Sequence, residues 1–192
     1  MSPSSIAFIV DGHMEQDVVQ HYCKDVPVRR LNCNSDDMPA ETVAKPLAAL
    51  IGLLNRAKHI FVVLDREGRP QSAAQFGEEV SKALADRNVD LQRLRVVVAD
   101  RETENWLLAD VESLKQKSYI RRDVSQRDFE GQGGKRELQK MMQEGRRYHE
   151  TVEGVELFKC IRPQIAAQNS ASFRRLVEVL RDHCPLLSSV MN

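Results

Sequence analysis

The sequence of 192 residues lacks several features that would assign it to a class at once. No run approaches the roughly 18 apolar residues that a membrane helix needs, so we expect no membrane-spanning segment. The four cysteines form no C-x-x-C pair, so we expect free thiols, and neither a zinc site nor a disulfide framework. There is no G-x-S-x-G motif and no cysteine with a recognisable catalytic partner, which argues against a serine or cysteine nucleophile.

The chain also lacks net charge, so the whole molecule has no general attraction for nucleic acid. The charge is uneven along the chain, however. Residues 1–112 carry 13 Lys/Arg and 18 Asp/Glu, whereas residues 113–192 carry 15 and 10. An acidic front half and a basic back half suit a metal centre beside a phosphate-binding surface. They equally suit two solvated surfaces without a role, and charge alone does not choose between these readings.

The composition is that of a globular protein, with 42% hydrophobic and 29% charged residues, which is enough apolar material for a core. The length suits one domain, or one domain with a helical extension. Residues 1–5 lack the basic region and apolar core of a signal peptide. We therefore expect a cytoplasmic protein.

Three largely apolar segments, the third of which contains Arg95, predict strands in the core of a sheet. They are expected at residues 6–10, 60–64 and 94–99, with a shorter strand around 26–31 and helices at 14–22, 39–57 and 71–86. This alternation predicts an α/β fold with a mainly parallel sheet and flanking helices.

The later part of the chain has a different pattern. Thr103 is expected to cap a helix that carries Trp106, Leu107, Leu108 and Val111, and the glycine-containing residues 118–134 predict a long loop. Three further helices are expected at 135–147, 149–161 and 172–183. We therefore predict an α/β core in residues 1–114 and a helical extension, packed on or covering the core, in residues 115–192.

Acidic residues follow all three confident strands. The set consists of Asp11 with Glu15, Asp65 with Glu67, and Asp100 with Glu102 and Glu104. Because the carboxyl ends of parallel strands share one edge of a sheet, we expect these side chains to converge. The i, i+2 spacing of Asp65 and Glu67 in an extended chain turns both carboxylates the same way.

Carboxylates crowded in this manner repel one another unless a cation or a base lies among them. Mg²⁺ prefers oxygen ligands, and such ions support phosphodiester cleavage, so the acids predict a site for Mg²⁺ or Mn²⁺. There is a simpler reading, because Asp and Gly are common after strands as turn and helix-cap residues. Asp65 and Glu67 also have Arg66 and Arg69 nearby as partners. The expected convergence of acids from three strand ends favours a metal site over this simpler reading.

Four segments resemble one known family. Residues 6–22, with Asp11-Gly12-His13-Met14-Glu15, resemble the first strand and turn of a TOPRIM domain, and residues 62–67 resemble its strand ending in Asp-x-Asp. Residues 102–110 are similar to an E-x-W-L-L-A-D element of small bacterial TOPRIM-like proteins, which are often encoded beside OLD-type ATPases. Residues 170–176 match the S-x-S-F-R ending of the same group. The resemblance spans about residues 6–180.

The resemblance implies a nuclease whose first acid is an acid/base group and whose acid pair holds Mg²⁺. Carried onto this chain, the catalytic residues are Asp11 and Glu15, and the metal ligands are Asp11, Asp65, Glu67 and Glu104. It further implies the effector of a bacterial anti-phage system with an OLD-type (ABC) or AAA ATPase as partner. A homodimer is compatible with the sequence.

Two positions depart from the TOPRIM pattern: Asp11 stands where the family has Glu, and Glu67 stands where it has the second Asp. A group that transfers a proton tolerates little displacement, since about 1 Å can cost roughly 10²-fold in rate. The departures motivate a second hypothesis, a TOPRIM-like subunit that has lost catalysis and binds a partner ATPase or nucleic acid. A small-molecule phosphotransferase or phosphatase is a third.

Four basic pairs in the back half are candidate contacts to a phosphate backbone. Together with one arginine after the second strand, the predicted nucleic-acid contacts are Arg69, Arg121, Arg122, Lys135, Arg136, Arg174 and Arg175, while Arg146-Arg147 forms the fourth pair. Each pair also fits a solvated helix face. Trp106 is expected in the core rather than in base stacking.

Overall fold

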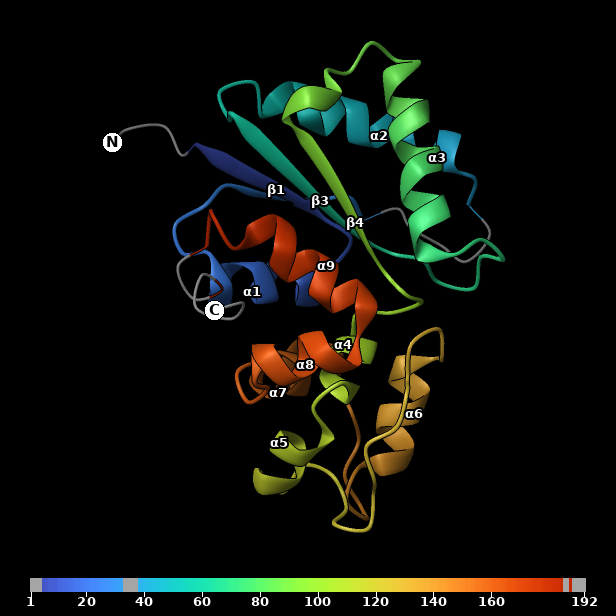
Figure 1. The fold of residues 1–192 in the computed structure, drawn as a ribbon, viewed down its shortest axis with the longest axis vertical. Coiled ribbons are helices and arrows are strands. Elements are labelled where there is room, and N and C mark those ends of the chain that lie inside the picture. Colours follow the sequence, from blue (N-terminus) through green and yellow to red (C-terminus); the bar gives the residue numbers. More distant parts are fainter. Residues whose placement is uncertain (1–4, 33–37, 185–186, 188–192) are drawn as a thin grey trace. The chain divides into compact units, whose positions relative to one another are not determined.

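The computed structural model describes residues 5–32, 38–184 and 187 (Figure 1). The chain divides into two compact units, Met1–Val98 and Ala99–Asn192, whereas the sequence suggests a change of character near Leu114. None of the helices in the described residues has the length and apolar content needed to cross a membrane.

The first unit carries the predicted α/β architecture, a four-stranded parallel sheet in the order β2-β1-β3-β4. Its strands are β1 (Ile6–Val10), β2 (Val28–Arg30), β3 (His59–Asp65) and β4 (Leu94–Ala99). Its helices are α1 (His13–Tyr22), α2 (Ala40–Leu53), α3 (Ala73–Ala85) and the short 3-10 helix Leu91–Arg93. Val10 pairs with Val63 of β3, so the carboxyl ends of β1 and β3 lie close together.

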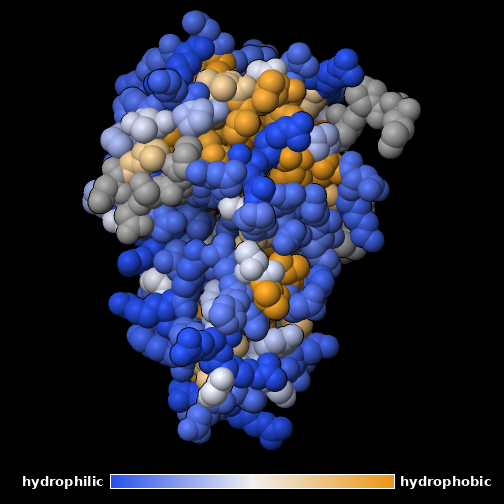
Figure 2. Space-filling view, turned by 180° about the vertical axis from the view of Figure 1, so that it is seen from behind, coloured by the Kyte–Doolittle hydropathy of each residue, from blue (hydrophilic) through white to orange (hydrophobic). Residues whose placement is uncertain are grey.

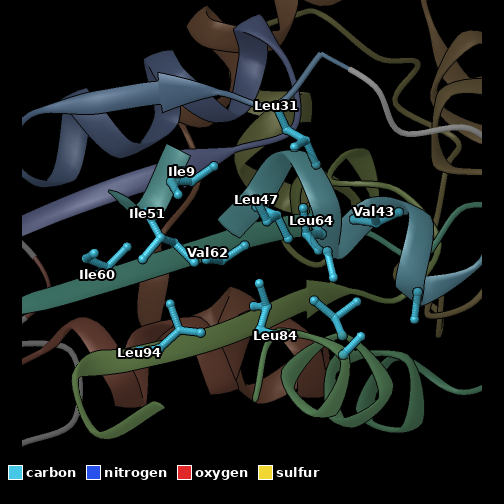
Figure 3. Close-up of a cluster of buried hydrophobic side chains, with 14 of the residues drawn as sticks. Ile9, Leu31, Val43, Leu47, Ile51, Ile60, Val62, Leu64, Leu84 and Leu94 are labelled. Atoms are coloured by element: carbon cyan, nitrogen blue, oxygen red, sulfur yellow. The ribbon is translucent and has the colours of Figure 1, made fainter. Parts of the chain in front are cut away.

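The strands β1, β3 and β4 are mainly apolar because both faces of the sheet are covered. On one face, Ile9 of β1 packs with Leu47 of α2 and Leu84 of α3, all fully buried (Figure 3). On the opposite face, which α1 covers in Figure 1, the rings of Phe8 and Phe61 stack with centroids 5.2 Å apart. This two-sided core fixes the strand ends, and with them the loops that follow β1 and β3.

The second unit is helical after the end of β4, and the face of it seen in Figure 2 is mostly hydrophilic. Its elements are α4 (Glu104–Leu108), α5 (Val111–Gln116), α6 (Gly134–Met141), the π-helix Glu150–Gly154, α7 (Val155–Phe158), α8 (Pro163–Asn169) and α9 (Ala171–Leu180). Trp106 is buried, as predicted, and its ring centroid lies 5.6 Å from that of Phe173. Its Nε1 donates to Oγ of Ser172 at 2.8 Å, which satisfies the polar end of the indole.

Several predicted helices of the second unit have other bounds. The helix expected to run through Val111 breaks at Asp110, whose carboxylate caps α5. The helix expected at 135–147 ends at Met141, because Met142 forms an antiparallel bridge with Ile120. The expected helix 149–161 is a π-helix followed by the short α7, and α8 was not predicted.

The cysteines differ in part from the expectation of free thiols. Cys160 is a free thiol. Cys23 and Cys184 are disulfide-bonded, so the expectation was wrong for these two residues.

Gly134, the first residue of α6, is packed too tightly to accept a side chain. An added Cβ would lie 2.8 Å from the backbone nitrogen of Asn105 and 2.9 Å from Cβ of Glu104. Asn105 is not free to move, since its Nδ2 donates to the carbonyl of Gln132 at 3.0 Å. We expect Gly134→Ala to lower the free energy of unfolding by about 1–3 kcal/mol, measured by urea denaturation.

Gly52 in α2 is the matched control for this substitution. Among the described residues, no heavy atom would lie within 4 Å of its added Cβ. Gly52→Ala should therefore be neutral or stabilising by up to about 1 kcal/mol, because alanine favours the helix. Equal changes in the two variants would contradict the packing assigned to Gly134.

Candidate functional site

Two of the predicted acids meet in the first unit. The backbone nitrogen of Asp65, the last residue of β3, donates to Oδ2 of Asp11, directly after β1, at 3.3 Å. Asp65 is 5% exposed and Asp11 is half-buried. The parallel register of β1 and β3 therefore brings these carboxylates to one edge of the sheet.

Glu15, in the first turn of α1, has a structural task. Its Oε2 accepts a hydrogen bond from the backbone nitrogen of Gly12, the N-cap of α1, at 2.8 Å. A glutamate at the third helical position that reaches back in this way satisfies a free amide at the helix start. Glu15, only 4% exposed, thus fixes the backbone next to Asp11.

Glu67 does not continue the extended chain of β3, so the expectation that i, i+2 spacing turns its carboxylate the same way as that of Asp65 was wrong. Glu67 has a φ of +57°, and the chain turns at Glu67 and Gly68 directly after β3. Alternation of side chains applies to an extended chain, and this backbone is in the left-handed region instead. Glu67 is half-buried in that turn.

Arg69 closes the loop after β3 and does not face solvent. It is 4% exposed, and its guanidinium carbon lies 4.2 Å from the ring centroid of Phe76. Its Nε donates to the carbonyl of Met38 at 3.0 Å, and its Nη1 donates to that of Arg66 at 2.8 Å. Because its guanidinium is turned inward onto carbonyls, we assign Arg69 to the support of this loop and not to a nucleic-acid surface.

The later acids lie in the second unit, and two of them, Glu102 and Glu104, accept hydrogen bonds there. Oε2 of Glu102 accepts from the backbone nitrogen of Lys135 at 2.7 Å, at the start of α6. Glu104 is fully buried, and its Oε1 accepts from the Tyr148 hydroxyl at 3.0 Å. Tyr148 lines a pocket of about 380 Å³, together with Lys135, Gln139, His149, Glu150 and Thr151.

The acidic side chains at the sheet edge offer Mg²⁺ few protein ligands. Within residues 5–32, 38–184 and 187, no group of three or more His, Cys, Asp or Glu side chains is arranged to hold a metal ion. Mg²⁺ is, however, commonly bound through one or two carboxylates, with water and substrate phosphate oxygens completing its shell. Asp11 and Asp65 each carry a carboxylate of the right chemistry at the same edge of the sheet, and they fit that mode.

A family model described as a domain of unknown function (DUF4276) matches residues 13–181. The match extends over most of both units. The chain belongs to the DUF4276 family. The matched segment includes Asp65 and Glu104 and begins two residues after Asp11. No curated protein and no solved structure matches the chain.

The predicted basic residues of this DUF4276 protein lie at several places in the second unit. Four of them form ion pairs: Arg121 with Asp123, Lys135 with Glu150, Arg136 with Glu137, and Arg175 with Glu178. Arg122 and Arg174 are exposed. The pairs 121–122 and 135–136 are near α6, whereas 174–175 belong to α9.

Glu130 is a carboxylate of the DUF4276 fold that no sequence motif marks. Its Oε1 accepts from the hydroxyls of Ser170 and Ser172, the latter at 3.0 Å. Ser172 is also the acceptor for Trp106, so the E-x-W-L-L-A-D and S-x-S-F-R segments meet at Glu130. Burial raises the pKa of Glu130, and the negative charge of Asp100 raises it further.

The raised pKa of Glu130 predicts a pH-dependent effect on stability. A group whose pKa is raised by folding stabilises the fold below its ordinary pKa, and that contribution is lost as pH rises through the folded value. Glu130→Gln keeps the acceptor oxygen but cannot ionise. We expect the variant to gain stability relative to wild type as pH rises from acid to neutral, measured by urea denaturation at each pH. A difference that is constant, or largest in acid, would contradict this account.

Proposed function

We propose that this DUF4276 protein is a Mg²⁺- or Mn²⁺-dependent, TOPRIM-like nuclease that cleaves phosphodiester bonds of nucleic acid. The observation that carries the proposal is the contact between Asp11 and Asp65 at the carboxyl ends of two adjacent parallel strands. Ligands of open parallel sheets bind beyond this edge. Asp65 is buried and Asp11 is half-buried at this edge, and carboxylate oxygens are the ligands that Mg²⁺ prefers.

Three residues of the first unit, Asp11, Asp65 and Glu15, have distinct parts in this proposal. Asp11 and Asp65 would hold the divalent ion, and Asp11, the more exposed, is the candidate acid/base group. A bound Mg²⁺ supplies positive charge that polarises the phosphate and stabilises the leaving oxygen. Glu15 is a positioning residue, since its carboxylate holds the Gly12 amide and so the loop that carries Asp11.

The wider role follows from the TOPRIM resemblance alone. We propose a cytoplasmic effector of an anti-phage system that acts with an OLD-type or AAA ATPase encoded nearby. Co-purification with the product of a neighbouring ATPase gene tests the partner. A chain that purifies alone when both genes are expressed would remove that part of the proposal.

Cleavage assays on DNA and RNA, with Mg²⁺ or Mn²⁺ and with a chelator, test the activity. We expect cleavage only with the divalent ion. The alternative, a subunit without catalysis, is favoured by the use of Glu15 as a helix cap and by the short side chain of Asp11. It predicts no cleavage with either ion and the same binding to a partner when Asp65 is replaced.

A further inference from the structure

Three cations of the second unit converge on one buried carboxylate. Glu137 of α6 is 6% exposed. It accepts from Nζ of Lys140 at 2.7 Å and from Nη2 of Arg127 at 2.9 Å, and Nε of Arg136 lies 3.8 Å from it. The side chains of the three cations are 57–72% exposed. One inward-facing acid therefore holds together three outward-facing positive charges.

Two further basic pairs lie at the carboxyl end of α6. The backbone nitrogen of Arg121 donates to the carbonyl of Met141, the last residue of α6, at 2.9 Å. The chain after α6 then returns to the same segment, and the guanidinium of Arg146 lies 5.6 Å from the ring centroid of Tyr119. These contacts place the exposed cations of residues 121–122 and 146–147 near the carboxyl end of the helix that carries Arg136 and Lys140.

We name this set the α6 basic surface, which consists of Arg121, Arg122, Arg127, Arg136, Lys140, Arg146 and Arg147. Residues 119–147 carry eight Lys/Arg and five Asp/Glu, so the surface keeps an excess of positive charge although the whole chain is neutral. Of the five acids, Glu137 is buried and Glu130 is half-buried against two serine hydroxyls. The other three acids, Asp123, Asp128 and Glu144, are exposed, so seven exposed cations face solvent with three exposed acids.

We infer that the α6 basic surface binds the phosphate backbone of a nucleic acid. Six of its seven cations are arginines, whose planar guanidinium matches phosphate oxygens in pairs. An eight-residue helix is about 12 Å long, a length over which a B-form strand presents about three to four phosphates at roughly 3.4 Å each. The ring of Tyr119 beside Arg146 adds a flat apolar contact of the kind that bases use.

The choice of nucleic acid as the occupant rests on the proposed function. The inference also makes the proposed function more specific, because it assigns substrate binding to α6 and its flanking loops. Arg69, which is buried, and the pair on α9 are left out. An anionic membrane would need the same charges, and the experiment distinguishes a membrane from a nucleic acid.

Binding is measured by fluorescence anisotropy with a short single-stranded DNA oligonucleotide, in chelator so that nothing is cleaved, over a series of salt concentrations. Two double variants are compared with wild type: Arg136→Ala with Lys140→Ala, and Arg122→Ala with Arg147→Ala. The Arg122→Ala, Arg147→Ala double variant leaves the contacts of Glu137 intact. It therefore tests the surface even if the Arg136→Ala, Lys140→Ala double variant folds poorly. Lys45→Ala with Lys82→Ala, exposed lysines on α2 and α3, is the matched control.

We expect each α6 double variant to bind about tenfold more weakly, and the slope of log Kd against log salt to become shallower by about 1.4, at roughly 0.7 for each lost phosphate contact. The control should leave both quantities unchanged. Wild-type levels of Kd and slope in both α6 variants would overturn the inference. It would also be overturned if Arg174→Ala with Arg175→Ala has the larger effect, or if wild type binds phosphatidylserine vesicles and no oligonucleotide.

The two proposals fail separately. Oligonucleotide binding with the expected salt dependence, but no cleavage with Mg²⁺ or Mn²⁺, removes the nuclease and keeps the α6 surface. Cleavage by wild type, with unchanged binding by both α6 variants, keeps the nuclease and removes the surface.

Discussion

Asp65→Asn is expected to slow metal-dependent cleavage by at least about 10²-fold and to leave the fold intact. Asparagine has the shape of aspartate but no charge, and the contact seen at Asp65 uses its backbone nitrogen, which the substitution keeps. A loss of 10²-fold corresponds to about 2.7 kcal/mol of transition-state stabilisation, the size expected when one polar group at a reacting phosphate is removed. Single-turnover cleavage rates measure it.

Asp86→Asn is the matched control for this substitution. Asp86 follows α3 in the same unit and is exposed. It carries the same charge as Asp65, away from the carboxyl ends of β1 and β3. We expect its cleavage rate to equal that of wild type. A rate for Asp65→Asn within about threefold of wild type, with the fold intact, would be inconsistent with a catalytic site at Asp65.

Arg162→Ala should be the most destabilising of the ion-pair substitutions, by about 2–4 kcal/mol. Asp110 is 1% exposed and accepts from Arg162 three times: from Nη2 at 2.6 Å, Nε at 2.9 Å and the backbone nitrogen at 2.8 Å. Burial alone would raise the pKa of Asp110, but the hydrogen bonds from Arg162 and Ser113 outweigh it and lower the pKa. Without the guanidinium, a buried carboxylate keeps its charge and loses its main partner.

Lys159→Ala provides the comparison, since the Lys159–Glu156 bridge has the same length of 2.6 Å. Both of its side chains are about half exposed, so water replaces the lost partner and the expected cost is below about 1 kcal/mol. Urea denaturation of the two variants measures the difference. Equal costs would show that burial of Asp110 does not set the strength of its pair.

The α/β core was predictable from the sequence because its signal is local. β1 and most of β3 are continuous apolar runs and β4 is interrupted only by Arg95, and segments of that kind predict strands covered on both faces without knowledge of the rest of the chain. The same logic predicted that Asp11 and Asp65, one residue after β1 and the last residue of β3, lie at one edge. Their contact follows from the parallel register.

The second unit was harder to predict because its boundaries depend on distant contacts. The break between α4 and α5 is set by Asp110, whose partner Arg162 is 52 residues away. Glu130 lies beside Ser170 and Ser172 through contacts that span 40 and 42 residues. A single sequence holds no signal for such pairs. The end of α6 had a local signal that was overlooked, since Gly145, at a φ of +79°, is a helix breaker inside the expected helix.

The Glu67 error has a similar origin. The i, i+2 rule assumes that the strand continues past its last apolar residue, and Gly68 was the residue that signalled a turn. For this reason the acidic site described here consists of Asp11 and Asp65, with Glu15 as support, and is smaller than the set of acids in the sequence.

The central claim is that Asp11 and Asp65 form a site for a divalent ion, and Mn²⁺ binding measured by isothermal titration calorimetry tests it most directly. Wild type and Asp86→Asn should bind Mn²⁺ with equal affinity. The double variant Asp11→Asn with Asp65→Asn should bind at least about tenfold more weakly, a loss of about 1.4 kcal/mol or more. The same Mn²⁺ affinity in all three proteins would contradict the claim.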